Sequence, residues 1–246
     1  MGHVRTVERA GVVLLTIDRP PANAMDRELL ADLLVAADRL AADVPPAVVL
    51  TGRAGYFSAG VDLKAIPGYD RADQRRMVDG INRMALGFYG LPCPVVCSIT
   101  GHAIAGGFVL ALCGDHRVAS AEGRYGLTEV KVGVPYPQAA IGVVRAELSA
   151  TATRVLALGN RLLDADACVR LGAFDEALPA PAVLDRAVAV AHELAELPAG
   201  VYRQTKAQLR DATLAALRTA AAHDPLHDGW LSPRESHSPQ ASPSPT

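Results

Sequence analysis

Residues 94–120, PVVCSITGHAIAGGFVLALCGDHRVAS, constrain the fold of this chain more than any other stretch. An apolar run typical of a buried strand (94–100) leads into a glycine turn and then into a helix-length apolar run that begins near Gly106. A short strand (116–120) follows. A strand, a helix and a second strand in this order are typical of a parallel βαβ unit. The segment therefore predicts an α/β protein with a parallel sheet.

The same alternation extends over about the first 140 residues. Further strands are predicted at 12–17 and 47–52, and helices at 25–43 and 70–90. The later part of the chain is helical and rich in alanine. We therefore expect a core over residues 1–190, a C-terminal helical region over 191–231, and a disordered Ser/Pro-rich tail over 232–246, because the tail offers too little apolar surface to order itself.

Composition excludes several classes of protein. The chain has 246 residues, of which 24 are basic and 26 acidic, so no basic surplus calls for a nucleic-acid partner. No apolar stretch reaches the roughly 18 residues that a membrane span needs. The N-terminal run GVVLLTI is short and flanked by charges, which argues against a signal peptide. The four cysteines form no CxxC pair, which favours inert thiols in a reducing cytoplasm.

Two glycine-rich loops each follow a predicted strand. They are FSAGVDLK at 57–64 and GHAIAGGFVLALCGD at 101–115. Glycine permits close backbone approach, and the helix that begins near Gly106 offers N–H groups without intrahelical partners. Two such N–H groups converging from two loops make an oxyanion hole for a carbonyl oxygen that gains negative charge. The alternative is that the glycines only form tight turns between strand and helix.

Four motifs, in this order and spacing, resemble the enoyl-CoA hydratase/isomerase family, also called the crotonase family. They are RPPANAM (19–25), TGRAGYFSAGVDLK (51–64), the opening segment and YGLTEVKVGV (125–134). The resemblance runs from about residue 4 to 230. It implies a crotonase-like spiral of ββα turns with two roughly perpendicular sheets and an acyl-CoA substrate in fatty acid metabolism. It also implies a C-terminal helical region that assembles a homotrimer or hexamer.

The resemblance also assigns roles to individual residues. The two oxyanion N–H groups match Val61 and Gly106, and the catalytic carboxylate of the family matches Glu129. Lys64 and Lys206 match lysines near the nucleotide and phosphates of CoA, although each could equally be a solvated surface charge. The substrate-binding residues implied in this way are Ala22, Ala59, Gly60, Asp62, Leu63, Lys64, Gly107, Val109, Tyr136 and Lys206. Asp62 could also act as a cap, and RPPANAM is one residue shorter than the common family form.

One departure from the family pattern bears on the reaction. Family hydratases carry a second glutamate three residues after the oxyanion glycine, where this chain has Val109. Hydration shares the handling of water between two carboxylates, whereas moving a double bond needs one base that takes a proton from C2 and returns it at C4. A single glutamate and a dry pocket with a raised pKa therefore favour a Δ3,Δ2-enoyl-CoA isomerase.

Two other readings stay open. The chain could be a 2-enoyl-CoA hydratase despite Val109, or an acyl-CoA-binding protein with little catalysis. A solvated loop carboxylate is the plain alternative for Glu129. The proposed chemistry requires no cofactor and no metal: His223 and His227 have metal-ligand spacing but read as a polar helix end. Asp115 is expected to be structural, and His102 is not expected to act as a base.

Overall fold

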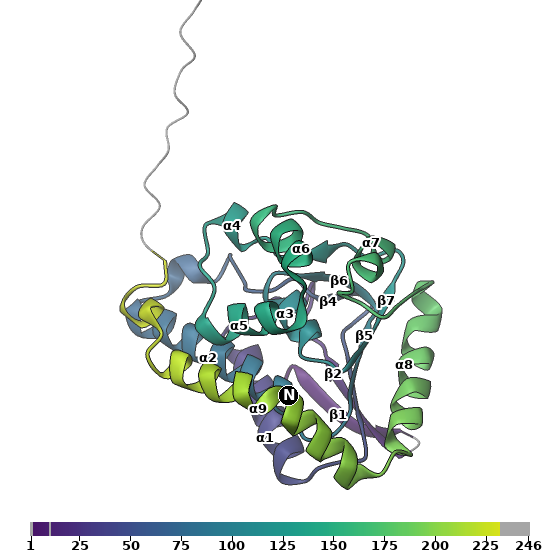
Figure 1. The fold of residues 1–246 in the computed structure, drawn as a ribbon. Helices are drawn as coiled ribbons and strands as arrows, with labels where there is room; N and C mark the ends of the chain where they lie inside the picture. The colour runs from purple at the N-terminus through teal and green to yellow at the C-terminus, as the bar shows by residue number, and fades with distance from the viewer. Residues whose placement is uncertain (1, 10, 232–246) are drawn as a thin grey trace, which may run out of the picture.

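A computed structural model of the chain describes residues 2–9 and 11–231, and its strands form two sheets (Figure 1). In spatial order the large sheet contains β1 (Val4–Arg9), β2 (Val12–Ile17), β3 (Val48–Thr51), β5 (Val95–Ile99), β7 (His116–Ser120) and β9 (Glu176–Leu178). The small sheet contains β4 (Gly55–Ser58), β6 (Gly101–Ile104) and β8 (Tyr125–Gly126). Strands β1 and β2 are antiparallel, and the other pairings are parallel.

The two sheets are built by one repeated turn of the chain. Each turn places a strand in the large sheet, the next strand in the small sheet, and then a helix. The three turns are β3, β4 and α2 (Arg71–Tyr89); β5, β6 and α3 (Gly106–Leu112); and β7, β8 and α4 (Glu129–Val132). This repeat confirms the predicted spiral of ββα turns.

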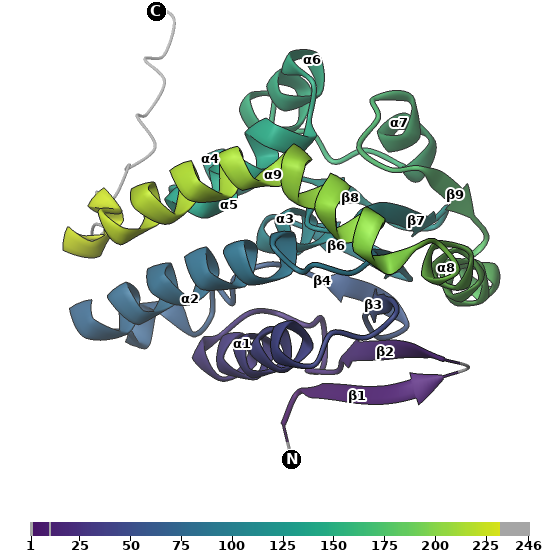
Figure 2. The ribbon, with the colours of Figure 1, turned by 60° about the horizontal axis from the view of Figure 1, so that its bottom comes forward.

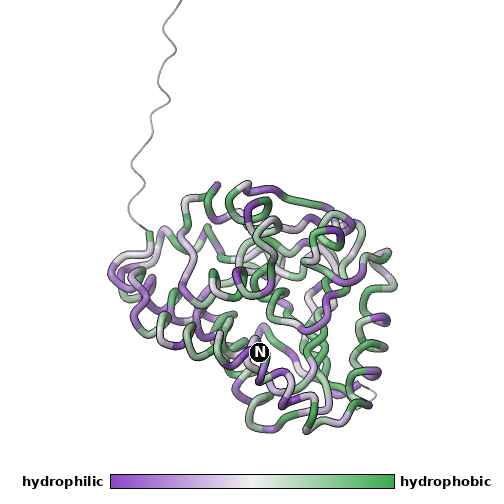
Figure 3. Tube along the Cα trace, in the orientation of Figure 1, coloured by the Kyte–Doolittle hydropathy of each residue, from purple (hydrophilic) through white to green (hydrophobic). Residues whose placement is uncertain are grey.

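The central strands β3 and β5 are buried along their whole length because each contributes side chains to two cores. Val48 and Leu50 point into the main core, whereas Val49 between them joins a second core under helix α8 (Ala180–Ala195). Val95 and Val96 divide in the same way. A sheet covered on both faces needs such runs. Figure 3 shows the hydrophobic strands and, at the right, α8 with both hydrophilic and hydrophobic residues.

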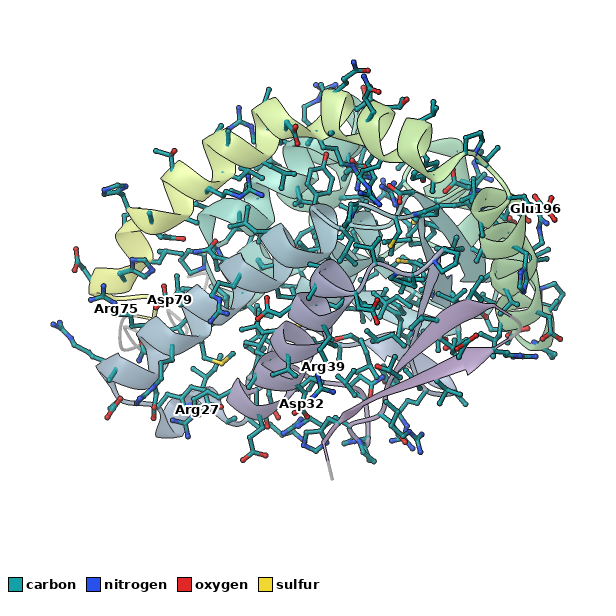
Figure 4. The ribbon with its side chains drawn as sticks, turned by 90° about the horizontal axis from the view of Figure 1, so that it is seen from below. Arg27, Asp32, Arg39, Arg75, Asp79 and Glu196 are labelled. Atoms are coloured by element: carbon teal, nitrogen blue, oxygen red, sulfur yellow. The ribbon has the colours of Figure 1, made fainter. Side chains whose placement is uncertain are left out.

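Helix α1 (Arg27–Ala42) shows how the outer helices pack. It begins at Asp26, whose carboxylate accepts a hydrogen bond from the N–H of Leu29 at 2.8 Å. Its buried stripe consists of Leu29, Leu30, Leu33, Ala36, Ala37 and Leu40. In Figure 4 the labelled charged side chains of α1 and α2 point away from the core. Helices α1, α2 and α9 (Ala199–Ala222) lie in successive layers (Figure 2).

The later part of the chain is helical, as expected. It contains α5 (Gln138–Glu147), α6 (Ala150–Thr153), the π-helical segment η2 (Arg154–Leu158), α7 (Ala165–Arg170), α8 and α9. Short 3₁₀ turns lie at η1 (Ile66–Gly68) and η3 (Pro225–Asp228). The expected boundary at residue 190 falls inside α8, which covers the large sheet. The predicted tail at 232–246 lies outside the described residues.

Short strands replace part of what the sequence predicted as glycine loops. Residues 55–58 and 101–104 form β4 and β6, which pair in parallel. A Cβ on Gly101 would lie 2.1 Å from the carbonyl carbon of Gly55, so the two strands come closer than side chains permit. Glycine is poor in strands unless backbones approach closely, which is why the pattern indicated a loop.

Cysteine placement agrees with inert thiols. Cys93, Cys97, Cys113 and Cys168 are all free and buried. Burial raises the pKa of the Cys93 thiol to about 11 and that of Cys97 to about 12, so neither is a ready thiolate near neutral pH. Within residues 2–9 and 11–231, no helix is long and apolar enough to cross a membrane.

The close approach of β4 and β6 predicts the effect of one methyl group. Gly101→Ala should destabilise the protein by at least about 2 kcal/mol, because the new Cβ meets backbone that cannot rotate away. Gly200→Ala in α9 is the matched control, since nothing lies within 4 Å of its Cβ and alanine favours the helix. Urea unfolding measures both. Equal midpoints for the two variants would contradict the prediction.

Candidate active site

The three predicted catalytic residues meet at one edge of the small sheet. Val61 lies three residues beyond β4, Gly106 two residues beyond β6, and Glu129 three residues beyond β8. The three strands are parallel and adjacent in the order β4, β6, β8. Their carboxyl ends therefore lie at the same edge, which is where α/β proteins place ligands.

The first loop turns the N–H of Val61 away from its neighbouring segment. Met25 and Val61 form an isolated parallel bridge, in which Met25 donates to the carbonyl of Gly60 at 2.7 Å and accepts from the N–H of Asp62 at 2.9 Å. In a parallel bridge of this kind, the central residue directs its own N–H to the opposite side. Within the described residues no protein acceptor faces the N–H of Val61.

The second loop exposes the first N–H groups of α3. Ala105 precedes the helix with φ of +53°, a conformation that non-glycine residues rarely adopt. Its N–H donates to Gly126 at 2.8 Å, and its carbonyl accepts from Phe108 and Val109. The N–H groups of Gly106 and Gly107 have no acceptor among the described residues. Both donors stand at the positive end of the short helix.

The two loops touch through glycine backbone. A Cβ on Gly60 would lie 2.7 Å from the carbonyl oxygen of Ile104 and 2.9 Å from the nitrogen of Gly106, and Gly60 also has φ of +76°. A Cβ on Gly106 would lie 4.0 Å from the nitrogen of Val61. The two free N–H groups are therefore neighbours, as an oxyanion hole requires.

Glu129 is a buried carboxyl group. It is 6% exposed, and burial raises its pKa to about 7. The Tyr136 hydroxyl donates to Oε2 of Glu129 at 2.8 Å and opposes that rise. The backbone bond between Ala105 and Gly126 ties the Glu129 strand to the oxyanion loop. The structure therefore excludes the plain alternative of a solvated loop carboxylate.

Helix α3 brings no second carboxylate to this edge. Phe108, Val109 and Leu112 are fully buried in the main core. Gly107 lets the helix pack on β4, because a Cβ there would lie 2.3 Å from the carbonyl oxygen of Ser58. The first turns of α3 are therefore apolar because their side chains pack in the main core.

Two residues that the sequence analysis did not single out hold the first loop. Asn23 is fully buried with φ of +50°, and its amide donates to the carbonyls of Ile17 at 2.9 Å and Phe57 at 3.0 Å. The Arg19 guanidinium contacts Asp26 at 2.6 Å and Asp62 at 3.0 Å. Both residues lie in the RPPANAM motif, which could have marked them as important. The motif does not show which residues they contact.

The remaining residues of the first loop are accounted for. The Asp62 carboxylate accepts from the N–H groups of Lys64 at 3.1 Å and Ala65 at 3.3 Å, so Asp62 acts as a cap and a partner of Arg19. Ala59 donates to the carbonyl of Ala22 at 3.0 Å, which joins the loop to RPPANAM. Leu63 and Lys64 are exposed, with no ion pair to Lys64 within the described part of the chain.

The structure corrects the role expected for Lys206. Its side chain is 8% exposed, and its ammonium donates to Asp115 at 2.6 Å and to the carbonyl of Cys93 at 2.8 Å. Arg210 also pairs with Asp115, at 3.1 Å. Lys206 is therefore neither a surface charge nor free to reach a phosphate. Asp115 also accepts from the N–H of Val95 at 2.8 Å, in agreement with its predicted structural role.

The histidines singled out in the sequence each have a partner within the fold. His102 accepts from the N–H of Arg124 at 2.9 Å. His227 lies 2.7 Å from Asp79, whereas His223 contacts the carbonyl of Thr219, so these two histidines face different partners. Residues 2–9 and 11–231 contain no group of three or more His, Cys, Asp or Glu side chains placed to hold a metal.

Comparisons with known proteins agree with this geometry. The sequence model of the family "Enoyl-CoA hydratase/isomerase" matches residues 7–227. A probable enoyl-CoA hydratase of Mycobacterium avium is 32% identical over 203 residues, which cover 80% of this chain and 77% of that protein. The human mitochondrial enoyl-CoA delta isomerase 1 is 30% identical over 221 residues, covering 85% and 71%.

Comparison with solved structures points to the same family. A crystal structure of a probable enoyl-CoA hydratase from Mycobacterium tuberculosis superposes with a TM-score of 0.84 at 29% identity, covering 89% of this chain and 93% of that one. A ββα spiral with two apposed backbone N–H donors and a buried glutamate thus defines a crotonase-fold enzyme. This chain belongs to the enoyl-CoA hydratase/isomerase family.

The buried ion pair predicts that Lys206 supports stability. Lys206→Met should lower the free energy of unfolding by about 3 kcal/mol, because Asp115 loses one of its two cations while staying buried. The exposed Lys64→Met is the matched control, with a change within about 0.5 kcal/mol. Denaturant unfolding gives both values. An unchanged stability with a raised KM for a CoA ester would restore the phosphate role of Lys206.

Proposed function

We propose that this protein is a Δ3,Δ2-enoyl-CoA isomerase that moves a double bond in an acyl-CoA thioester. The observation that carries the proposal is the buried carboxyl group of Glu129 at the same sheet edge as two backbone N–H groups that have no acceptor among the described residues, with Val109 buried where family hydratases carry a second glutamate. The relatives described above include both hydratases and an isomerase, so the choice between the two reactions rests on these residues.

The reaction divides between the two parts of the site. The thioester oxygen of a 3-enoyl substrate accepts hydrogen bonds from Val61 and Gly106. The Glu129 carboxylate removes a proton from C2, and the electron pair spreads over C2 to C4 and the oxygen as a dienolate. The same carboxyl group returns the proton at C4, which leaves a conjugated 2-enoyl thioester. Donors aimed at the developing oxyanion are worth several kcal/mol in such a step.

The environment of Glu129 suits a base that is used and then restored. A base with a pKa near the working pH is half ionised and still able to hold a proton between its removal and its return. Burial raises the pKa of Glu129 to about 7, well above that of an exposed glutamate. The carboxyl group is therefore partly ionised near neutral pH and can hold the proton until it is returned.

Hydration would require more catalytic groups than the migration of a double bond. A water molecule must be held and deprotonated while a second group delivers a proton to the α-carbon. Val109 offers neither a charge nor a hydrogen bond, and its neighbours on α3 are apolar and buried.

We further propose that Lys64, exposed at the loop of Val61, contacts the CoA moiety. A homotrimer or hexamer, a cytoplasmic location and the lack of a cofactor stay predictions.

The proposal predicts a clear loss in one variant. Glu129→Gln should lower the rate of chromophore formation from a 3-enoyl-CoA by about 10²–10⁴-fold, because the amide cannot take the C2 proton. Ultraviolet absorption of the conjugated thioester follows the reaction. Glu193→Gln, which changes an exposed carboxylate on α8 that pairs with Arg186, is the control and should keep full activity.

The same assay tests the competing functions. A 2-enoyl-CoA supplied to the unchanged enzyme should keep its chromophore, apart from its equilibrium with the 3-enoyl isomer. Steady loss of the chromophore with formation of a 3-hydroxyacyl product would show a hydratase and would overturn the proposal. Tight binding of the CoA ester with no change in either substrate would indicate a binding protein.

Isomerase activity should also depend on pH. The base must be ionised in the free enzyme, so kcat/KM should rise with pH, pass its midpoint at about 7 and then level off. Below the midpoint it should fall about tenfold for each pH unit, because the ionised fraction falls by that factor. A pH profile of initial rates measures this. A flat profile between pH 5 and 8 would show that Glu129 is not the titrating base.

A further inference from the structure

The hydroxyl of Tyr136 lies on one oxygen of the Glu129 carboxyl group. It donates to Oε2 at 2.8 Å, and Oε1 has no side-chain hydrogen-bond partner within residues 2–9 and 11–231. Burial and the neighbouring carboxyl group both raise the pKa of Tyr136. The phenol therefore keeps its proton across the working pH and acts as the donor. The contact makes the two oxygens of Glu129 unequal.

The segment that carries Tyr136 is anchored on both sides. The N–H of Val134 donates to the carbonyl of Glu129 at 3.0 Å, and the indole of Trp230 donates to the carbonyl of Pro135 at 2.9 Å. Beyond Tyr136, the N–H of Gln138 donates to the carboxylate of Asp224 at 2.8 Å. These bonds fix the backbone around the phenol, so its hydroxyl has a set position relative to the carboxyl group.

The buried carboxylate of Asp224 joins three helical elements. Asp224 also accepts from the amide of Asn82 on α2 at 2.9 Å, and that amide oxygen accepts from the N–H of Ala139 at 2.8 Å. Asp224 and Asn82 are 3% and 2% exposed. Helices α2 and α5 and the segment after α9 are thereby linked next to the end of the Tyr136 segment.

We propose that Tyr136 is a positioning residue that holds Oε2 of Glu129, so that Oε1 alone carries the proton between C2 and C4 of the substrate. This inference rests on the proposed function. One fixed oxygen delivers the proton on the same face of the dienolate from which it was taken. The proton leaves C2, resides on Oε1 and bonds to C4, and the phenol neither gains nor loses a proton overall.

The hydrogen bond also determines when the base is ionised. A donor to a carboxylate stabilises its charged form and lowers its pKa, against the opposite effect of burial. The backbone N–H groups of Thr128 and Glu129 act in the same direction. Lys131 on α4 is exposed, and so is Arg154 on η2, which packs against α4 and where Arg154 bonds Thr151. Tyr136 is thus the side chain that keeps Glu129 a base near neutral pH.

Tyr136→Phe tests the inference because it removes the hydroxyl and keeps the ring. The acid limb of the kcat/KM profile should move to higher pH by about one to two pH units, the effect of losing a hydrogen bond to a charged group. At high pH the rate should largely return. Tyr202→Phe on α9 is the matched control and should leave the profile in place. A fall in rate that is equal at every pH would overturn the inference.

A second substitution should act in the opposite direction. Replacing Tyr136 by 3-fluorotyrosine makes the phenol a stronger donor without removing it, so the acid limb should move to lower pH. Together the two changes give opposite signs at one position, which a loss of folding or a general loosening of the site cannot produce. Shifts of the same sign for both would contradict the proposed donor role.

A direct titration separates this inference from the isomerase proposal. Carbon-13 labelling of glutamate carboxyl groups lets NMR follow the pKa of Glu129, with its resonance identified by its absence from Glu129→Gln. Tyr136→Phe should raise that pKa whatever reaction the enzyme catalyses. A raised pKa without isomerisation would overturn the proposed function and support the donor role of Tyr136. An unchanged pKa in an active isomerase would overturn the inference alone.

Discussion

The site depends on a contact between two backbone segments that leaves no room for a side chain. Gly60 approaches the carbonyl of Ile104 and the nitrogen of Gly106 so closely that a methyl group would overlap both. Because of this approach, the N–H groups of Val61 and Gly106 become neighbours, although 45 residues separate them in the chain. The parallel pairing of β4 with β6 brings the segments together, and the glycines allow the final approach. The apposition of these two N–H groups, which we propose forms an oxyanion hole, is thus a product of sheet geometry.

The sequence predicted some strands and the fold family correctly, but it did not predict two strands of the small sheet. Strand 12–17 and strand 116–120 have the predicted bounds because turn residues mark the ends of both. The strands β4 and β6 were not predicted, because glycine opposes strand formation locally and the reason for its presence lies on another strand. The fold family followed from the order of four motifs, and the roles predicted for Val61, Gly106 and Glu129 came from the resemblance to that family.

The errors in the site share a physical cause. Lys206 reads as a surface lysine on an amphipathic helix, and only the fold shows Asp115 beneath it. Arg19 and Asn23 form their contacts with residues 17–62, so their role depends on distances that a sequence does not contain. Tyr136 was expected to bind substrate, and its hydrogen bond to Glu129 is a contact that no spacing in the sequence indicated. Polar side chains are the hardest to predict because each needs a specific partner, whereas an apolar side chain needs only a core.

The ion pair of Lys206 also bears on the order in which the chain can be completed. Asp115 lies just before β7, and its partners Lys206 and Arg210 stand on the last long helix. During synthesis the first half of the protein emerges well before these two cations. Until they are made, Asp115 lacks both cations that pair with it in the finished fold. The last helix therefore completes an ion-pair cluster whose acidic member lies near the middle of the chain.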